Sequence, residues 1–311
     1  MLSLSGYKQN TTYSVKYFDD KLRDFSFEVD SILDDFDKKL SIYDSSSMVS
    51  QINRNIDIEI DKTFLECFCK AMDVSKVTDG AFDITVAPII SVWGFGKEKR
   101  KTVSQIEIDS ILQFVGYKKV WINNNKIVKQ DPRITLNFNA IAQGYSVDII
   151  SFFLQSKKIE NYVVEIGGEV FAKGTKPDGS PWYVGVEKPA DNTSDSLNDL
   201  KLIIKLMNMA VSTSGNYRNF YIDNGVKYSH TINPKTGYPV KNTLLSATIV
   251  AIDCASADAY ATACMVKGLD NSKLFLEMHP ELEAYLLYSN ADGKIDAYMT
   301  KSFEKLITKL E

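Results

Sequence analysis

The 311-residue sequence is poor in histidine and cysteine, the residues that build most transition-metal sites. Its two histidines are His230 and His279, and the spacing of its four cysteines fits no zinc-binding pattern. We therefore expect the cysteines to be small buried hydrophobic residues, and His279 to lie on the surface. The cysteines are Cys67, Cys69, Cys254 and Cys264.

Long hydrophobic runs and an excess of positive charge are also missing. No segment approaches the roughly 20 apolar residues that a membrane-spanning helix needs. The formal net charge is -4 and the basic residues are scattered, so we expect no nucleic-acid partner. The first residues lack the basic flank and apolar stretch of a signal peptide. We expect either a cytosolic protein or one whose export signal lies outside this sequence, and localisation stays open.

Hydrophobic residues make up 44% of the chain, which is enough to build a core. The length exceeds a typical domain of roughly 100–200 residues, so one large or two small domains are possible. The polar stretch 190–198 is too short to mark a boundary between domains.

Helical periodicity is clear in several segments. Apolar residues between Leu22 and Leu40 recur at helical spacing and predict an amphipathic helix of about five turns. Ser104 and Glu107 predict a capping box that opens a helix ending near Gly116. Further helices are predicted over 63–77, 142–155, 256–267 and 302–310.

Strand patterns are interspersed with these helices. The alternating residues 12–18 predict a strand, and Asn123 to Asn125 predict a hairpin turn between 119–122 and 126–129. Because the strands and helices show no regular βαβ alternation, we expect an α+β fold. Further strands are predicted over 134–138, 162–166, 182–186, 201–206, 244–252, 285–288 and 295–299, the last two as a hairpin.

Asp258 and Thr262 are the first candidates for a functional site. They are four residues apart, so they share one face of the predicted helix. A carboxylate, a hydroxyl and a backbone carbonyl such as that of Ala261 are oxygen donors that suit Mg²⁺. The alternative is a helix N-terminus in which Asp258 favours the dipole and Thr262 bonds back to the helix.

Two glycine-containing turns are further candidates. Around 137–148 a strand is predicted to run into a helix, where free carbonyls can bind a cation and N–H groups can bind a phosphate. Gly167 and Gly168 follow an apolar strand and permit close approach of a ligand. Each pattern alone is equally typical of an ordinary turn.

Hydroxyl side chains and one histidine complete the set. Residues 211–218 place Thr213 and Ser214 in a predicted turn that is either an anion cradle or a hydrogen-bonded loop. His230 lies in a polar segment, where a lone histidine is more often structural than catalytic.

Together these segments resemble the ApbE family of FAD:protein FMN transferases. The resemblance rests on their order along the chain from about Thr11 to Gly268, since no single motif is decisive. The matching segments are the strand at 11–15, residues 40–44 with Asn53, residues 80–88 and 92–96, Ala-Gln-Gly-Tyr at 142–145, Ile-Gly-Gly-Glu at 166–169, Thr-Ser-Gly-Asn-Tyr at 213–217, Tyr-Ser-His at 228–230, Asn-Pro-Lys-Thr-Gly at 233–237, and Ala-Asp-Ala at 257–259 with Ala-Thr at 261–262.

The resemblance implies a single α+β domain over residues 1–311, with mixed and antiparallel sheets, packed helices and an FAD cleft. It implies that Mg²⁺ is held by Asp258, Thr262 and the backbone carbonyls of Ala140 and Ala261. It implies that His230 assists catalysis and also lies at the nucleotide. The other residues placed around FAD are Tyr43, Ala81, Phe82, Asp83, Asn137, Gln143, Thr213, Ser214 and Ile232. Gln143 departs from the family pattern, because lysine is common there.

The implied reaction splits the FAD pyrophosphate. A threonine of an acceptor flavoprotein, within a short Ser/Thr-containing motif, attacks the phosphorus on the FMN side while AMP leaves. His230 has the pKa range of a base at neutral pH. Two alternatives stay open: an FAD pyrophosphatase that uses water as acceptor, and a flavin-binding protein without turnover. Family members are often exported or anchored at the outer face of the cytoplasmic membrane.

Overall fold

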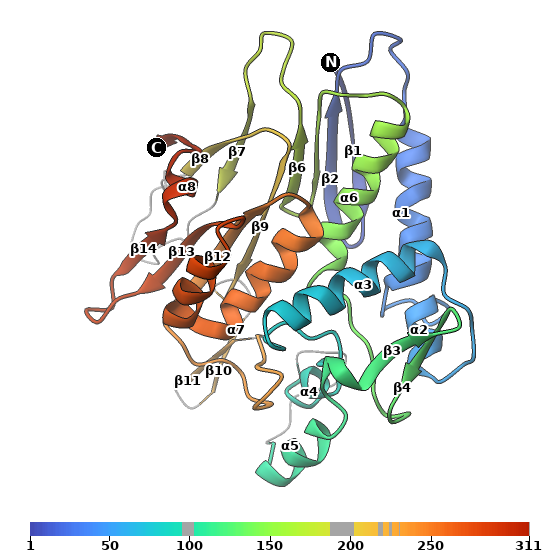
Figure 1. Ribbon diagram of the computed structural model, residues 1–311, viewed down its shortest axis with the longest axis vertical. Coiled ribbons are helices and arrows are strands. Elements are labelled where there is room, and N and C mark those ends of the chain that lie inside the picture. Colours follow the sequence, from blue (N-terminus) through green and yellow to red (C-terminus); the bar gives the residue numbers. More distant parts are fainter. Residues whose placement is uncertain (95–102, 187–201, 217–219, 224–225, 230, 311) are drawn as a thin grey trace.

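The computed structural model describes residues 1–94, 103–186, 202–216, 220–223, 226–229 and 231–310. Its centre is an eight-stranded antiparallel sheet with the spatial order β1-β2-β5-β6-β9-β12-β13-β14 (Figure 1). The bounds are Leu2–Lys8 for β1, Thr11–Tyr17 for β2, Tyr162–Ile166 for β5, Glu169–Lys173 for β6, Met209–Gly215 for β9, Leu244–Ala251 for β12, Glu283–Ser289 for β13 and Ile295–Met299 for β14. Helices packed on antiparallel sheets confirm the predicted α+β class.

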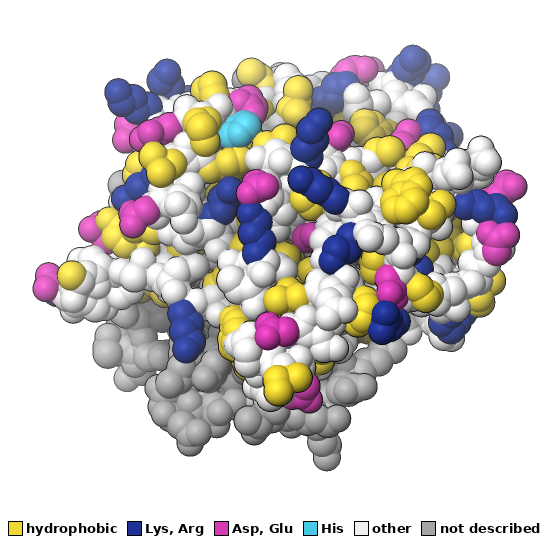
Figure 2. All heavy atoms as spheres, turned by 60° about the horizontal axis from the view of Figure 1, so that its bottom comes forward, with side chains coloured by type: hydrophobic (Ala, Val, Ile, Leu, Met, Phe, Trp, Pro, Cys, Tyr) yellow, Lys and Arg dark blue, Asp and Glu magenta, His cyan; other side chains and the backbone are white. Residues whose placement is uncertain are grey.

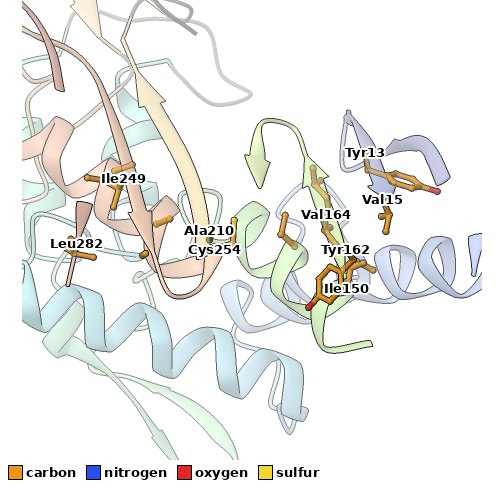
Figure 3. Packing of buried hydrophobic residues seen from close by; sticks show 14 of the residues in the cluster. Tyr13, Val15, Ile150, Tyr162, Val164, Ala210, Ile249, Cys254 and Leu282 are labelled. Carbon is orange, nitrogen blue, oxygen red and sulfur yellow. The ribbon is translucent and has the colours of Figure 1, made fainter. Parts of the chain in front are cut away.

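Three helices cover one face of this sheet: α1 (Ser26–Leu40), α6 (Ala142–Ser156) and α7 (Cys254–Met278). The core between them is made mainly of buried aliphatic side chains with several tyrosines and phenylalanines, and Figure 3 shows Val15 and Val164 of the sheet near Ile150 of α6. Each such side chain contributes about 1.5–3 kcal/mol on burial. This layer fixes α6 and α7 relative to the strands that border the site.

A smaller sheet packs on the opposite face. Its strands lie in the order β15-β8-β7, with bounds Ile307–Leu310, Leu202–Leu206 and Trp182–Val186. Alternation along β9 explains the two layers, because Ala210 belongs to the helix-side core whereas Val211 belongs to the core under the smaller sheet. The short helix α8 (Lys301–Glu304) adds Phe303 to this second core.

Helix α7 lies between two cores, which explains its many alanines. Ala257 and Ala261 pack toward the large sheet, whereas Ala259 and Ala263 pack toward the cluster that contains α3. The remaining elements are α2 (Met48–Asn53), α3 (Lys62–Val77), α4 (Ala87–Val92), α5 (Gln105–Leu112), the 3-10 turn η1 (Tyr117–Lys119), and the hairpins β3–β4 (Val120–Asn123, Lys126–Lys129) and β10–β11 (Phe220–Asp223, Val226–Ser229).

The surface carries charges of both signs. On the face in Figure 2, lysine and arginine side chains alternate with aspartate and glutamate rather than forming one positive area. Among the described helices, none combines the length and the apolar character needed to cross a bilayer.

Several predicted elements are confirmed, including the capping box of Ser104 and Glu107 and the hairpin turn at Asn124 and Asn125. The helix predicted from Leu22 begins only at Ser26, because Leu22 is exposed and has a positive φ of 51°. Helix α7 continues past Lys267 to Met278, across a non-helical Gly268.

Three predictions of secondary structure are wrong. Residues 134–138 form no strand, since the backbone of Leu136 exchanges hydrogen bonds with the side chain of Asn53. Residues 307–310 form β15 against β8 instead of continuing a helix. The hydroxyl-rich segment predicted as a turn is strand β9 up to Gly215, and its residues 217 and 218 lie outside the described residues.

Three of the four cysteines are buried as predicted. Cys69 is the exception, because it lies on the outward side of α3 and is exposed. His279 is only partly exposed: its ring lies against that of Phe275, tilted by 37° with the centroids 4.3 Å apart, and its Nδ1 lies 2.9 Å from Glu281.

Candidate active site

One large cleft of about 1690 Å³ gathers most of the predicted site residues. It is bordered by the turn between β5 and β6, the end of β9, the middle of α7, the edge strand β7, and the loops around 81–91 and 137–143. The predicted residues that line it are Tyr43, Ala81, Phe82, Asp83, Asn137, Ala140, Gln143, Thr213, Ser214, Ile232, Asp258 and Thr262.

Two predicted residues are not among those lining residues. Ala261 is fully buried and packs in the core toward the sheet, so its side chain does not border the cleft. His230 lies outside the described residues. Thr231 and Ile232, which follow His230 in the chain, both line the cleft.

The N-terminus of α7 is held by three charged side chains. Asp148 of α6 accepts hydrogen bonds from the N–H groups of Cys254 and Ala255 at 2.8 and 2.9 Å. Asp253 caps the helix through the Ser256 N–H at 2.8 Å, and Lys70 donates to Asp253 at 2.9 Å. Burial raises the pKa of Asp148 to about 7, although the two N–H donors oppose this shift. These contacts fix α7 and therefore the position of Asp258.

Helices α6 and α7 lie very close to each other at Gly144. Its N–H donates to Oδ2 of Asp258 at 3.1 Å. A Cβ atom at this position would lie 2.4 Å from the carbonyl oxygen of Cys254 and 2.9 Å from Cβ of Asp258. Only glycine permits this approach, which allows the backbone of α6 to orient the Asp258 carboxylate of α7.

We expect the substitution Gly144→Ala to destabilise the protein, although alanine is the better helix former. On a free helix surface this change stabilises by about 1 kcal/mol, but forced overpacking costs about 1–3 kcal/mol. Urea unfolding should therefore show a lower free energy of unfolding. Gly185→Ala is the matched control, because a Cβ there meets no atom within 4 Å. Equal stability of the Gly144→Ala variant and the native protein would contradict the close contact.

Asp258 and Thr262 face the cleft from one side of α7, as their four-residue spacing predicts. The Thr262 hydroxyl lies 3.2 Å from the Ser214 hydroxyl at the end of β9. Burial raises the pKa of Asp258 to about 7, against the hydrogen bond from Gly144. The buried carboxylate of Asp258 and the two paired hydroxyls thus line the same cleft.

Asp83 lines the cleft but also organises the loop that carries it. Its Oδ1 accepts from the N–H and the hydroxyl of Thr85 at 2.8 and 2.6 Å, and its Oδ2 accepts from the N–H of Tyr117 at 2.7 Å. Burial raises the pKa of Asp83, while these donors favour the charged form. The carboxylate therefore positions Ala81 and Phe82 on the cleft wall.

Gln143 and the β5–β6 turn form another part of the wall. Gly167 and Gly168 have φ values of 65° and 109°, which allow a two-residue turn between Ile166 and Glu169. A Cβ on Gly167 would lie 1.7 Å from Nε2 of Gln143, so the side chain of Gln143 lies directly against this turn.

Residues 231–239, which follow His230, form a tight turn that is hydrogen-bonded to other parts of the protein. Ile232 pairs with Pro239, and the N–H of Gly237 donates to the carbonyl of Asn233 at 2.8 Å. The indole N–H of Trp93 donates to the carbonyl of Gly237 at 2.7 Å. Thr231 donates to the side chain of Asn216 at 2.8 Å. The position of the chain next to His230 is therefore well fixed.

Comparison with known proteins gives the family. A family model described as the ApbE family matches residues 9–286. The FAD:protein FMN transferase of Haemophilus influenzae is 36% identical over 324 residues, covering 98% of this chain and 91% of that protein. The protein of the same name from Vibrio cholerae is 33% identical, with 98% and 92% covered.

Solved structures agree with these relatives. The flavin transferase ApbE from Vibrio cholerae matches with a TM-score of 0.87 at 32% identity, covering 98% of both chains. The apo flavinyl transferase ApbE from Pseudomonas stutzeri matches with a TM-score of 0.88 at 31% identity, covering 98% of this chain and 96% of that one. The fold is thus that of a class of flavin transferases. The chain belongs to the ApbE family.

Proposed function

We propose that this protein takes FMN from FAD and attaches it through a phosphoester to a threonine of an acceptor protein, in a Mg²⁺-dependent reaction that releases AMP. Flavin transfer is the activity in the names of the curated relatives, and it makes the chain a transferase. The observation that supports the proposal most strongly is the convergence on one cleft of Asp258, Thr262 and those residues expected at FAD that the structure describes.

The oxygen donors at the base of the cleft fit a hard divalent cation. Asp258 offers a carboxylate, Thr262 a hydroxyl, and Ala140 lies in the loop that borders the same space. Mg²⁺ prefers oxygen ligands and keeps positions for water and substrate phosphates, so a few protein ligands suffice. Among the described residues there is no cluster of three or more His, Cys, Asp or Glu side chains able to hold a metal, which fits a site completed by phosphates. When bound, the ion would neutralise charge on the pyrophosphate.

The remaining chemistry belongs to side chains of the protein and the acceptor. The threonine Oγ forms a bond to the phosphorus on the FMN side, and the bond from that phosphorus to the AMP oxygen breaks. We assign His230 to take the threonine proton, since imidazole is half-protonated near neutral pH.

The size of the cleft favours a protein acceptor over water. Pockets for one small molecule usually measure about 300–1,000 Å³, so a cleft of about 1690 Å³ leaves room beside a nucleotide. The extra space borders Thr12, Ser14 and Lys16 of β2 and the edge strand β7. We propose that the acceptor segment enters here, with its Ser/Thr motif directed toward the pyrophosphate.

Release of AMP should distinguish transfer from hydrolysis. A bound threonine is positioned for attack and so outcompetes water despite the high concentration of water. We expect slow AMP release from FAD and Mg²⁺ alone, and release at least about tenfold faster when a threonine-bearing acceptor is added. Chromatography of the nucleotides measures both rates. Fast AMP release that ignores acceptors would instead identify an FAD pyrophosphatase, and FAD binding without AMP would identify a flavin-binding protein.

A further inference from the structure

Glu169 is a buried carboxylate in the cleft that the sequence patterns did not single out as a site residue. It is the first residue of β6, directly after the Gly167–Gly168 turn, and its pairing with Ile166 fixes its backbone. Its side chain is only 8% exposed, yet it lines the same cleft as Asp258 and Thr262.

One oxygen of this carboxylate is left without a hydrogen bond. Oε1 accepts from the Ser212 hydroxyl at 3.3 Å, whereas Oε2 is buried and has no partner among the described residues. An unpaired buried carboxylate is costly, because it loses its hydration without gaining a compensating contact. A group of this kind in a ligand cleft needs an explanation beyond packing.

The charged groups around Glu169 increase this cost. Burial raises the pKa of Glu169 most, and the charges of Asp258 from α7 and Glu165 from β5 raise it further. Burial raises the pKa of the Cys254 thiol, and the nearby charges of Asp148, Glu169 and Asp258 raise it further. In the described part of the chain, no lysine or arginine forms an ion pair with Glu169 or Asp258.

We propose that Glu169 binds, through its free Oε2, the same divalent cation as Asp258. A cation between two buried carboxylates removes their mutual repulsion and supplies the missing partner. The β5–β6 turn and α7 would then hold the ion from two sides of the cleft. This inference rests on the proposed function in one respect, which is that the reaction in this cleft depends on a metal ion. Binding of the metal ion can be measured without any turnover.

Binding of Mg²⁺ to the full chain without FAD tests the proposal. Glu169→Gln keeps the shape of the side chain and removes its charge. We expect it to weaken Mg²⁺ binding at least tenfold by calorimetry, and to lose most of the thermal stabilisation that Mg²⁺ gives the native protein. In EDTA, the variant should melt at the same or a higher temperature, because one of two repelling carboxylates is gone.

Two controls separate a metal ligand from a structural residue. Glu165→Gln makes the same change on the neighbouring strand, where the carboxylate also lines the cleft. Ser212→Ala removes the hydrogen bond to Oε1 but keeps the charge. The Mg²⁺ dissociation constants of both controls should stay within about twofold of the native value, because a change of that size corresponds to a negligible free energy.

Three results would overturn the proposal. Glu169→Gln could bind Mg²⁺ as tightly as the native protein, or it could melt at a lower temperature in EDTA, which would indicate a structural carboxylic acid bonded to Ser212. The native protein could also fail to bind Mg²⁺ without FAD. In each case, a separate assay of FMN transfer by the native protein tests the proposed function, which stands if transfer is observed.

Discussion

Replacing Asp258 with alanine is expected to lower FMN transfer by at least about 100-fold while the fold is kept. Asp258 is the one carboxylate on the α7 face that lines the cleft, and the Gly144 N–H fixes its orientation. Losing a charge contact worth several kcal/mol in the transition state slows the reaction by a factor of about 100 or more. Transfer rates at saturating FAD, together with circular dichroism, measure both parts of the prediction.

A matched control is available on the same helix. Asp270 is exposed on the second half of α7, so Asp270→Ala removes one carboxylate from the helix without touching the cleft. It should transfer FMN at the native rate. Asp258→Asn adds a second comparison, because the amide oxygen can still accept the hydrogen bond from Gly144 while the charge is lost. Near-native turnover of Asp258→Asn would rule out a role for the charge of this residue.

Replacing His230 with alanine is expected to slow the chemical step more than it weakens FAD binding. A general base acts in the transition state, so its loss lowers kcat by roughly 10²–10⁴-fold and leaves the FAD dissociation constant nearly unchanged. Single-turnover kinetics with a threonine acceptor give kcat, and flavin fluorescence gives the affinity for FAD.

The second histidine provides the control for this experiment. His279 follows α7 and contacts Phe275 and Glu281 rather than the cleft. His279→Ala should leave kcat unchanged, even if it lowers stability. If His230→Ala changes only the affinity for FAD, then His230 is a binding residue and another group takes the threonine proton.

Local patterns in the sequence predicted the parts of the site that lie within one element. The spacing of Asp258 and Thr262 places both on one face of α7, and the structure directs that face into the cleft. The glycine pair before Glu169 was expected to allow positive φ or the close approach of a ligand, and both glycines have positive φ angles. Such features depend on the period of one helix or on the backbone freedom of one residue, so they can be read without knowing the fold.

Features that depend on distant contacts were not predictable in this way. The residues Tyr43, Ala81 and Asn137 lie far apart in the sequence, and only the family resemblance placed them together before the structure did. Residues 307–310 have helical spacing, but pairing with β8 makes them a strand. Strand β9 is rich in hydroxyl groups because it borders the cleft, which made it resemble a turn. Tertiary context decides these cases over local propensity.

The unpaired Glu169 illustrates the same limit at the level of one atom. Its position after Gly-Gly was visible in the sequence, but its burial and its free oxygen depend on how β6, β9 and α7 pack. Likewise, the requirement for glycine at position 144 follows from the distance between α6 and α7, which no local pattern specifies.

Intact-mass spectrometry of an acceptor protein tests directly whether this protein transfers FMN. The acceptor carries the Ser/Thr-containing motif, and it is incubated with this protein, FAD and Mg²⁺ beside a version with its target threonine changed to alanine. We expect the native acceptor to gain the mass of one FMN, bound through phosphate, while the alanine version gains nothing and AMP appears in equal amount. An unmodified acceptor, in the presence of FAD that has been split to FMN and AMP, would contradict the transferase assignment.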